Sequence, residues 1–208
     1  MKPLAIDLFC GLGGWTEGLL AEGFDVVGFD IERREYPGQL VIQDVMTLHG
    51  RQFKDVALIV ASPPCQGYSY RAMPWSRAKA LPPPDNSLFE ACFRIQCEAS
   101  DAAGHRIPMV VENVRGAQKW VGRAKWHYGS FYLWGDVPAL MPMGEREFKS
   151  VQDGLGGYGG SFGWNNTPMR RGNSKSSGRK QASAIIAKIP YPLSRHIAWA
   201  YSPRESHA

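Results

Sequence analysis

Residues 56–69, with the sequence VALIVASPPCQGYS, decide the fold class. The first part, residues 56–60, is a short apolar run that is typical of a buried parallel strand. Pro63 and Pro64 then end the strand, because proline fixes φ and lacks a donor for the ladder. Cys65 is therefore expected on a stiff loop at the carboxyl end of a strand, where open α/β sheets bind ligands. A Pro-Cys pair alone is more often a half-buried cysteine beside a turn, so its meaning depends on the flanking sequence.

A glycine-rich loop precedes this stretch. Residues 4–9 predict a first strand, residues 10–14 (CGLGG) a loop that opens a helix, and residues 25–29 a second strand that ends at Asp30. Glycines between a strand and a helix let the backbone approach a ligand closely. Asp30 lies 19 residues after Gly11, where a carboxylate can bind ribose hydroxyls. Thr16 occupies the third glycine position of the dinucleotide fingerprint, so a packing turn with a strand-end acid remains the alternative.

Two more strands follow the same pattern. Residues 41–45 predict a short strand in which Asp44 is suited to accept from an amine such as adenine N6. Residues 108–113 (PMVVEN) predict a buried strand with Glu112 at its carboxyl end. Strands alternating with helices indicate an α/β fold with a doubly wound, mostly parallel, Rossmann-like sheet and right-handed crossovers. In such a sheet Cys65 and Glu112 are expected to face one crevice.

The net charge of +5 hides an asymmetry. Residues 154–204 contain no Asp or Glu but eight Lys and Arg, whereas the rest of the chain carries 16 basic and 19 acidic residues. A near-neutral body with a cationic C-terminal quarter favours a polyanionic partner over a membrane, because no basic amphipathic helix accompanies it. A solvated basic tail is the alternative that charge alone leaves open.

Composition excludes several other classes of protein. The 208 residues suffice for one domain with a sizeable core, and 44% hydrophobic residues is ordinary for a soluble protein. No apolar run approaches the roughly 20 residues that span a bilayer, and no signal-peptide pattern opens the sequence. The four cysteines show neither a CxxC pair nor a disulfide framework, which predicts a cytoplasmic protein. His127 has no spaced Cys or His partner, so no metal site is expected.

Two segments predict contact with a substrate. Residues 70–84 mix prolines, cations and Trp75 in a long loop beside Cys65, which favours a substrate-clasping lid. Residues 119–135 alternate aromatic with basic residues. This pattern suits stacked bases and phosphates, but it equally suits a small β core beneath a loop.

Three motifs together resemble the cytosine-C5 DNA methyltransferase family, in particular its short phage and bacterial members. They are residues 7–14 (DLFCGLGG), residues 64–66 (PCQ) and residues 112–114 (ENV), and their order and spacing also agree. The resemblance implies a catalytic domain at residues 1–118 that binds S-adenosylmethionine. It further implies a reduced, basic and glycine-rich target-recognition region at residues 119–180, irregular and facing DNA. Residues 181–208 would form a helical segment that returns to the catalytic domain.

The resemblance also implies roles for individual residues. Cys65 would add to C6 of a cytosine that is flipped out of double-stranded DNA, because a base cannot be reached inside the duplex. Glu112 would hold a proton at N3 of that base, and Asn113 would fix the carboxyl group and its loop. The residues implied for S-adenosylmethionine are Asp7, Phe9, Gly11, Gly13, Gly14, Asp30, Ile31, Asp44, Val45 and Pro64.

The sequence departs from the family in its C-terminal half. It has no clear Gln-x-Arg-x-Arg segment, which in the family helps hold the target base; Arg170 and Arg171 lie in the right region without the pattern. Only 95 residues follow Asn113, so specificity is expected to be short, relaxed or supplied by a partner subunit. Two alternatives stay open: the same chemistry on RNA, and an inactive protein that binds S-adenosylmethionine and DNA as a regulator.

Overall fold

One mixed sheet organises the computed structural model, which describes residues 2–69, 82–141, 184–185 and 187–203. Among these residues seven strands lie in the order β3-β2-β1-β4-β5-β7-β6. All neighbours from β3 to β5 are parallel, and β7 is antiparallel to both β5 and β6. The mostly parallel sheet predicted from the sequence is therefore confirmed. The strands are β1 (Leu4–Leu8), β2 (Asp25–Asp30), β3 (Gln39–Ile42), β4 (Leu58–Ala61), β5 (Met109–Asn113), β6 (Trp126–Tyr128) and β7 (Phe131–Gly135).

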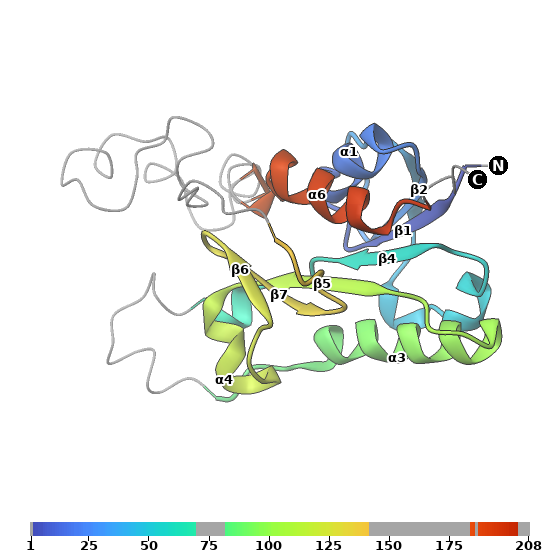
Figure 1. The fold of residues 1–208 in the computed structure, drawn as a ribbon. Coiled ribbons are helices and arrows are strands. Elements are labelled where there is room, and N and C mark those ends of the chain that lie inside the picture. Colours follow the sequence, from blue (N-terminus) through green and yellow to red (C-terminus); the bar gives the residue numbers. More distant parts are fainter. Residues whose placement is uncertain (1, 70–81, 142–183, 186, 204–208) are drawn as a thin grey trace.

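Helices cover the two faces of the sheet unequally. In Figure 1, α1 (Gly14–Ala21) and α6 (Tyr191–Tyr201) lie together on one side of the sheet, and α3 (Ser87–Ala103) lies on the other. The remaining helical segments are short. They are α4 (Gln118–Val121) and the 3₁₀ turns η1 (Val45–Thr47), η2 (Gly50–Phe53), η3 (Gln66–Tyr68) and η5 (Arg115–Ala117).

Each central strand contributes to two hydrophobic cores. Ile59 of β4 is buried in the core beneath α3, together with Ile95 of that helix. The next residue, Val60, is buried in the core beneath α1 and α6, together with Trp15. Side chains alternate between the faces of a strand, so a strand covered on both sides must be apolar throughout. This is why residues 56–60 form a continuous apolar run.

The C-terminal helix packs closely on the helix that follows the glycine loop. A Cβ atom added at Gly14 would lie 2.4 Å from the backbone N of Ile189, and one at Gly18 would lie 2.3 Å from the backbone N of Arg195. Lys188 Nζ also lies 2.6 Å from a carboxylate oxygen of Glu17. The two glycines on α1 thus permit a backbone contact that no larger residue would allow.

The sheet continues beyond residue 118, the predicted end of the catalytic domain; the boundary itself stays a prediction. β6 and β7 form an antiparallel hairpin that joins the outer side of β5. Phe131 and Leu133 of β7 are fully buried in the core beneath α1 and α6. Of the two interpretations of residues 119–135, the β core therefore accounts for the buried aromatics. The rest of the predicted recognition region, residues 142–180, lies outside the described residues.

Tyr36 covers the part of β2 that faces α1. In the described chain no helix joins β2 to β3; residues 31–38 form a loop instead. A Cβ added at Gly28 would lie 2.4 Å from the Tyr36 ring, so the ring fits there because glycine has no side chain. The Tyr36 hydroxyl is bonded to the Thr16 hydroxyl, which fixes the loop against α1.

Candidate active site

The candidate site lies where the strand order reverses. β2 and β3 follow β1 on one side, whereas β4 and β5 lie on its other side. In open α/β sheets this switch point lies at the carboxyl ends of the strands and is where ligands bind. Three segments meet at this edge. They are the glycine loop after β1, the loop of Cys65 after β4, and the end of β5, which carries Asn113.

The loop of Cys65 is anchored to the core on its C-terminal side. Cys65 itself is half-buried, with φ −95° and ψ 0°, and it precedes the turn η3. The Tyr68 N–H donates to the Cys65 carbonyl at 3.0 Å. The Tyr68 ring is only 4% exposed, and its hydroxyl donates to Asn86 Oδ1 at 2.9 Å. Cys65 is thus partly exposed while the backbone beside it is held in place.

Two side chains hold the N-terminal side of the same loop. The Trp15 indole Nε1–H donates to Ser62 Oγ at 2.9 Å, and Asn113 Nδ2 donates to the Pro63 carbonyl at 2.9 Å. Asn113 is fully buried, and its Oδ1 accepts from the backbone N of Val114 at 2.8 Å. Because both ends of its side-chain amide are used, Asn113 ties the end of β5 to the cysteine loop.

Glu112 comes to the same edge on the neighbouring strand. β4 and β5 pair directly, with Ala61 opposite Val111, so the ends of these two strands are adjacent. Glu112 is 3% exposed and lies level with Leu133 of β7. Side chains alternate along a strand, so Glu112 and Asn113 point to opposite faces. The acid thus faces the side of α1, while the amide of Asn113 supports the loop.

Only one of the three predicted cofactor glycines faces open space. Gly11 has φ +52°, and a Cβ added there would meet nothing closer than 4.0 Å. Its N–H donates to Asp30 Oδ2 at 3.0 Å, which joins the loop to the end of β2. By contrast, a Cβ at Gly13 would lie 2.5 Å from Pro37, and Gly14 packs against Ile189. Cofactor contacts of Gly13 and Gly14 stay predictions.

Phe9, which leads into this loop, has an unusual backbone conformation. Its φ of +58° is the only positive value at a non-glycine residue among those that the structure describes. Such a conformation costs on the order of 1–3 kcal/mol and persists only where the surroundings enforce it, often at functional sites. The Cys10 N–H donates to the Phe29 carbonyl at 3.1 Å and holds the turn. The strained turn lies at the switch point.

Asp7 is bonded to the protein itself. It is completely buried, and Oδ2 accepts from the Thr16 hydroxyl at 2.7 Å and from the Tyr36 hydroxyl at 3.4 Å. Its Oδ1 has no hydrogen-bond partner in the described structure. Burial raises the pKa of Asp7 to about 7, although the bonds from Thr16 and Tyr36 act in the opposite direction. A direct contact of Asp7 with a cofactor stays a prediction.

The residues beside the glycine loop fit an adenosine group. Ile31, after the end of β2, is 69% exposed and offers an apolar surface to a ring. Asp30 keeps acceptor capacity for hydroxyls, because each oxygen accepts a single backbone N–H, from Gly11 or from Glu32. The exposed Asp44 caps η1 by accepting from Met46 N at 2.9 Å, while Val45 is buried. A carboxylate with free acceptor capacity beside an exposed apolar residue suits a ribose and a purine.

The sequence alone did not reveal the residues that hold this edge together. Trp15 and Tyr68 support the cysteine loop from α1 and η3, and Tyr36 supports the glycine loop. Their only sequence signal is proximity to the motifs. Pro64 is exposed beside Cys65. The lid predicted at residues 70–84 falls mostly outside the described residues, as do Arg170 and Arg171.

Within the described ranges, no cluster of three or more His, Cys, Asp or Glu is arranged to hold a metal ion. The same residues include no helix with the length and apolar character required to cross a bilayer.

The fold and the motif-bearing edge together define an α/β protein of the methyltransferase type. The model of the C-5 cytosine-specific DNA methylase family matches residues 4–120, more than half of the chain. The chain therefore belongs to the C-5 cytosine-specific DNA methylase family, as its motifs predicted.

Several solved structures resemble this one over part of its length. One is described as a DNA modification methyltransferase encoded within an E. coli prophage (23% identity, TM-score 0.40, 58% of this chain and 34% of that chain). A second is the S. pombe Dnmt2 methyltransferase (18% identity, TM-score 0.41, 57% of this chain and 36% of that chain). A third is the Entamoeba histolytica methyltransferase EhMeth (15% identity, TM-score 0.41, 57% of this chain and 40% of that chain). The chain thus spans about a third to two fifths of the length of these structures. No curated protein matches the chain significantly.

Proposed function

We propose that this protein methylates cytosine at C5 in double-stranded DNA through a covalent intermediate on Cys65. The observation that carries the proposal is the bond from Asn113 Nδ2 to the Pro63 carbonyl at 2.9 Å. It joins the strand of the buried acid Glu112 to the loop of the half-exposed thiol Cys65. A nucleophile and an acid held on adjacent strand ends suit a reaction in which both act on one ring.

The chemistry requires both groups because cytosine C5 is a weak nucleophile. A bond from Cys65 Sγ to C6 converts the ring into an enamine, and the displaced electron pair moves toward N3. Glu112 gives a proton to N3, which stabilises the adduct. Once C5 carries the methyl group, a base takes the C5 proton, the C5–C6 double bond forms again as the C6–Sγ bond breaks, and the N3 proton returns to Glu112. Asn113 takes no part in proton transfer and keeps the loop at a fixed distance from β5.

S-adenosylmethionine is the proposed cofactor and, when bound, supplies the electrophilic methyl group for C5. Gly11 would admit the cofactor close to the backbone, Asp30 would accept from the ribose hydroxyls, and Ile31 would lie against the adenine. Asp44 would accept from the adenine amine. The remaining predicted contacts, from Asp7, Phe9, Gly13, Gly14, Val45 and Pro64, are part of the same proposal.

Covalent trapping tests the proposal without knowledge of the target sequence. The DNA is a duplex of several hundred base pairs in which every cytosine is replaced by 5-fluorocytosine. Fluorine at C5 prevents the final elimination, so the protein should stay attached to DNA through hot detergent once S-adenosylmethionine is present. Wild-type protein and Cys97→Ser should form the adduct, whereas Cys65→Ser should form none.

Cys97 is the matched control because it is an exposed cysteine on α3. Failure of the wild-type protein to form any adduct with cofactor present would contradict the proposal. Adduct formation on 5-fluorocytosine RNA but not on DNA would show that the substrate is RNA and that the reaction still proceeds through a covalent adduct. Bisulfite sequencing of DNA from expressing and non-expressing cells then gives the target sequence, and fractionation of those cells tests the cytoplasmic location.

A further inference from the structure

A second acid-free stretch begins directly after the catalytic strand. Residues 113–135 contain four Lys and Arg but no Asp or Glu. These residues run from the end of β5 through η5 and α4 to the β6–β7 hairpin. The basic residues of the C-terminal quarter lie elsewhere in the sequence, so this stretch is a separate source of positive charge.

The four cations are exposed and have no carboxylate partner among the residues that the structure describes. Every side chain of the set is exposed, and no described carboxylate lies within ion-pair distance of any of them. The nearby Asp85 accepts from the Ser87 backbone N at 2.8 Å. We call the set the η5–β6 cations; its members are Arg115, Lys119, Arg123 and Lys125.

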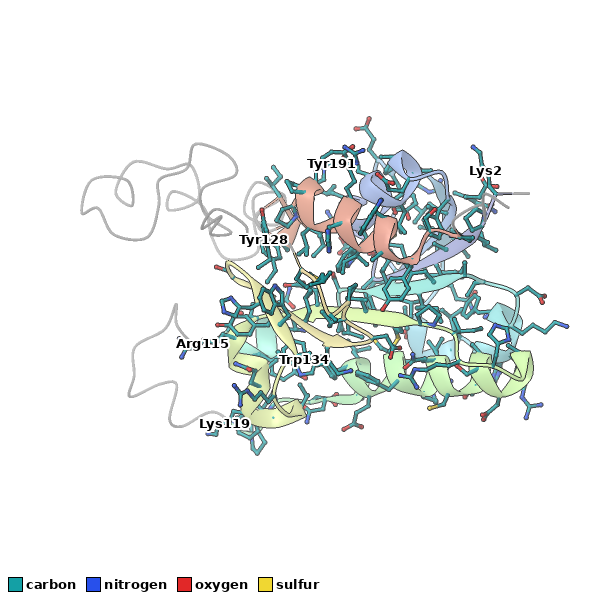
Figure 2. The ribbon with its side chains drawn as sticks, in the orientation of Figure 1. Lys2, Arg115, Lys119, Tyr128, Trp134 and Tyr191 are labelled. Carbon is teal, nitrogen blue, oxygen red and sulfur yellow. The ribbon has the colours of Figure 1, made fainter. Side chains whose placement is uncertain are left out.

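The η5–β6 cations adjoin the candidate active site. Figure 2 shows Arg115 and Lys119 toward the end of the molecule where Tyr128 closes β6, while Lys2 lies at the opposite end. Asn113, Tyr132 and His127 form one row across β5, β7 and β6. The exposed His127 ring stacks on Tyr132 with centroids 5.0 Å apart. The row thus links the end of β5 to β6, the strand that directly follows Lys125.

We infer that the η5–β6 cations bind phosphates of the DNA duplex beside the extruded cytosine. This inference rests on the proposed function. Exposed cations next to a base-flipping site suit the phosphates on either side of the target, because each contact releases a counterion and needs no base sequence. Residues 115–125 would therefore contribute to DNA affinity directly, in addition to the acid-free C-terminal quarter.

The salt dependence of binding tests this inference. The triple variant Lys119→Gln/Arg123→Gln/Lys125→Gln leaves Arg115, close to the catalytic strand, unchanged. Each lost phosphate contact should lower the slope of log Kd against log salt concentration by about 0.9, so a decrease of about 2–3 is expected. Fluorescence anisotropy with a labelled duplex, measured without cofactor at several salt concentrations, gives the slope.

The matched control is Lys2→Gln/Arg51→Gln/Lys54→Gln, which removes the same charge from residues that precede β1 and β4 at the amino ends of the strands. Its slope should equal that of the wild type. Equal slopes for all three proteins, or equal decreases in both variants, would overturn the inference. The decrease should also be the same on two duplexes of unrelated sequence; a decrease on only one would assign these residues to base recognition instead.

The outcomes separate this inference from the proposed function. If the wild-type protein binds DNA and forms the Cys65 adduct while the triple variant shows the same salt slope, the result contradicts only the role of the η5–β6 cations. If the wild-type protein binds no duplex and forms no adduct, the result contradicts both the proposed function and this inference. Thermal unfolding of the variants checks the fold, and exposed substitutions of this kind should change stability by less than about 0.5 kcal/mol.

Discussion

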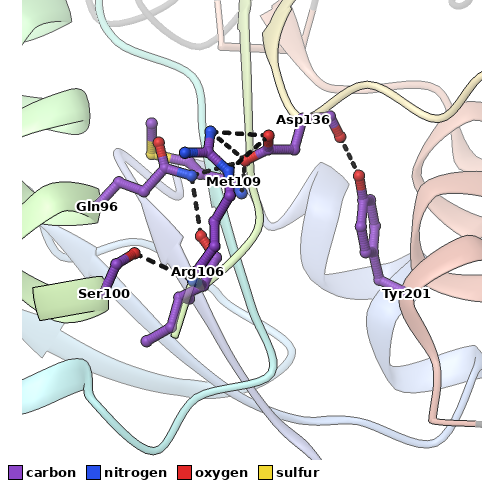
Figure 3. Close-up of polar contacts among 7 residues, drawn as sticks. Gln96, Ser100, Arg106, Met109, Asp136 and Tyr201 are labelled. Carbon is purple, nitrogen blue, oxygen red and sulfur yellow. Dashed lines mark hydrogen bonds and ion pairs between the residues drawn. The ribbon is translucent and has the colours of Figure 1, made fainter. Parts of the chain in front are cut away.

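The two ends of β5 both carry polar clusters, but these clusters differ in what their groups are bonded to. At the amino end, the Asp136 carboxylate accepts from the Met109 backbone N at 3.1 Å and from Gln96 Nε2 at 2.7 Å. Arg106 adds a bidentate ion pair, with its closest contact at 2.8 Å. Figure 3 shows these bonds converging on one carboxylate, while the backbone carbonyl of Asp136 accepts from Tyr201 of α6.

At the carboxyl end, the bonds hold the backbone beside the proposed nucleophile. Asn113 is bonded to the Pro63 carbonyl, and Tyr68 to the Cys65 carbonyl, while Cys65 itself is only partly buried. The Asp136 cluster, in contrast, uses both carboxylate oxygens within the protein. The comparison shows how a satisfied cluster that stabilises the fold differs from a supported cluster that can act on a ligand.

The pKa of Asp136 agrees with a structural role. Burial alone would raise it, but the bonds from Arg106, Met109 N and Gln96 together outweigh burial and hold the pKa below its usual value of 3.8. The Asp136 carboxylate is therefore charged at neutral pH. Four variants test whether the two ends of β5 differ as described.

The largest effect is expected for Glu112→Gln at the carboxyl end. The amide keeps the shape of the side chain but has no proton to give to N3. Turnover should fall by about 10²–10⁴-fold, the usual contribution of a general acid. Single-turnover methylation measures the rate, and thermal unfolding should show little change. A variant that retains full activity would remove Glu112 from the mechanism.

Asn113→Ala should affect both stability and reaction rate. It leaves the buried Pro63 carbonyl without its donor, which costs about 1–3 kcal/mol, and it releases the cysteine loop. Chemical denaturation and the rate of Cys65 adduct formation are measured together. Gln96→Ala is the matched control, because it removes an amide that donates to Ile107 O and Asp136 at the other end. This control should lose stability without slowing adduct formation.

Asp136→Asn should lower stability by about 1–3 kcal/mol at neutral pH and leave the activity of the folded protein unchanged. The pKa of Asp136 is lowered in the folded state, so its contribution is present above the unfolded value of 3.8 and is lost as the pH falls below it. The stability difference between wild type and variant should therefore shrink below about pH 4. Urea denaturation at several pH values measures this, and a constant difference would argue against the charge.

The smallest effect is expected for Trp15→Phe, which removes the bond to Ser62 and keeps an aromatic ring. The loss of stability should be about 0.5–1.5 kcal/mol. Trp134→Phe is the matched control, because its indole donates to the Gly122 carbonyl at 3.0 Å, away from the cysteine loop. In a Cys97→Ser background, Trp15→Phe should change the rate of Cys65 alkylation by iodoacetamide. Equal rates in both variants would show that Trp15 does not position the loop.

The sequence predicted the strands best where the physical signal was local. Residues 56–60 and 108–111 are apolar without interruption because both faces of their strands are covered, and prolines mark the end of β4. The bond between the Gly11 N–H and Asp30 was not predicted; it forms because β1 and β2 are adjacent parallel strands that end at one edge. The β6–β7 hairpin was less clear, since buried aromatics and nucleic-acid-binding aromatics have the same residue pattern until packing distinguishes them.

The sequence by itself determined the family, the doubly wound sheet, and the chemical groups delivered to its carboxyl edge, because each depends on residues close together in the chain. Only the tertiary structure decided which glycines pack against protein and which face open space. It also decided that Asn113 and Trp15 support the cysteine loop from two sides. These contacts join residues 47 and 50 positions apart, and distances of that kind depend on the packing of helices on the sheet, which no local pattern encodes.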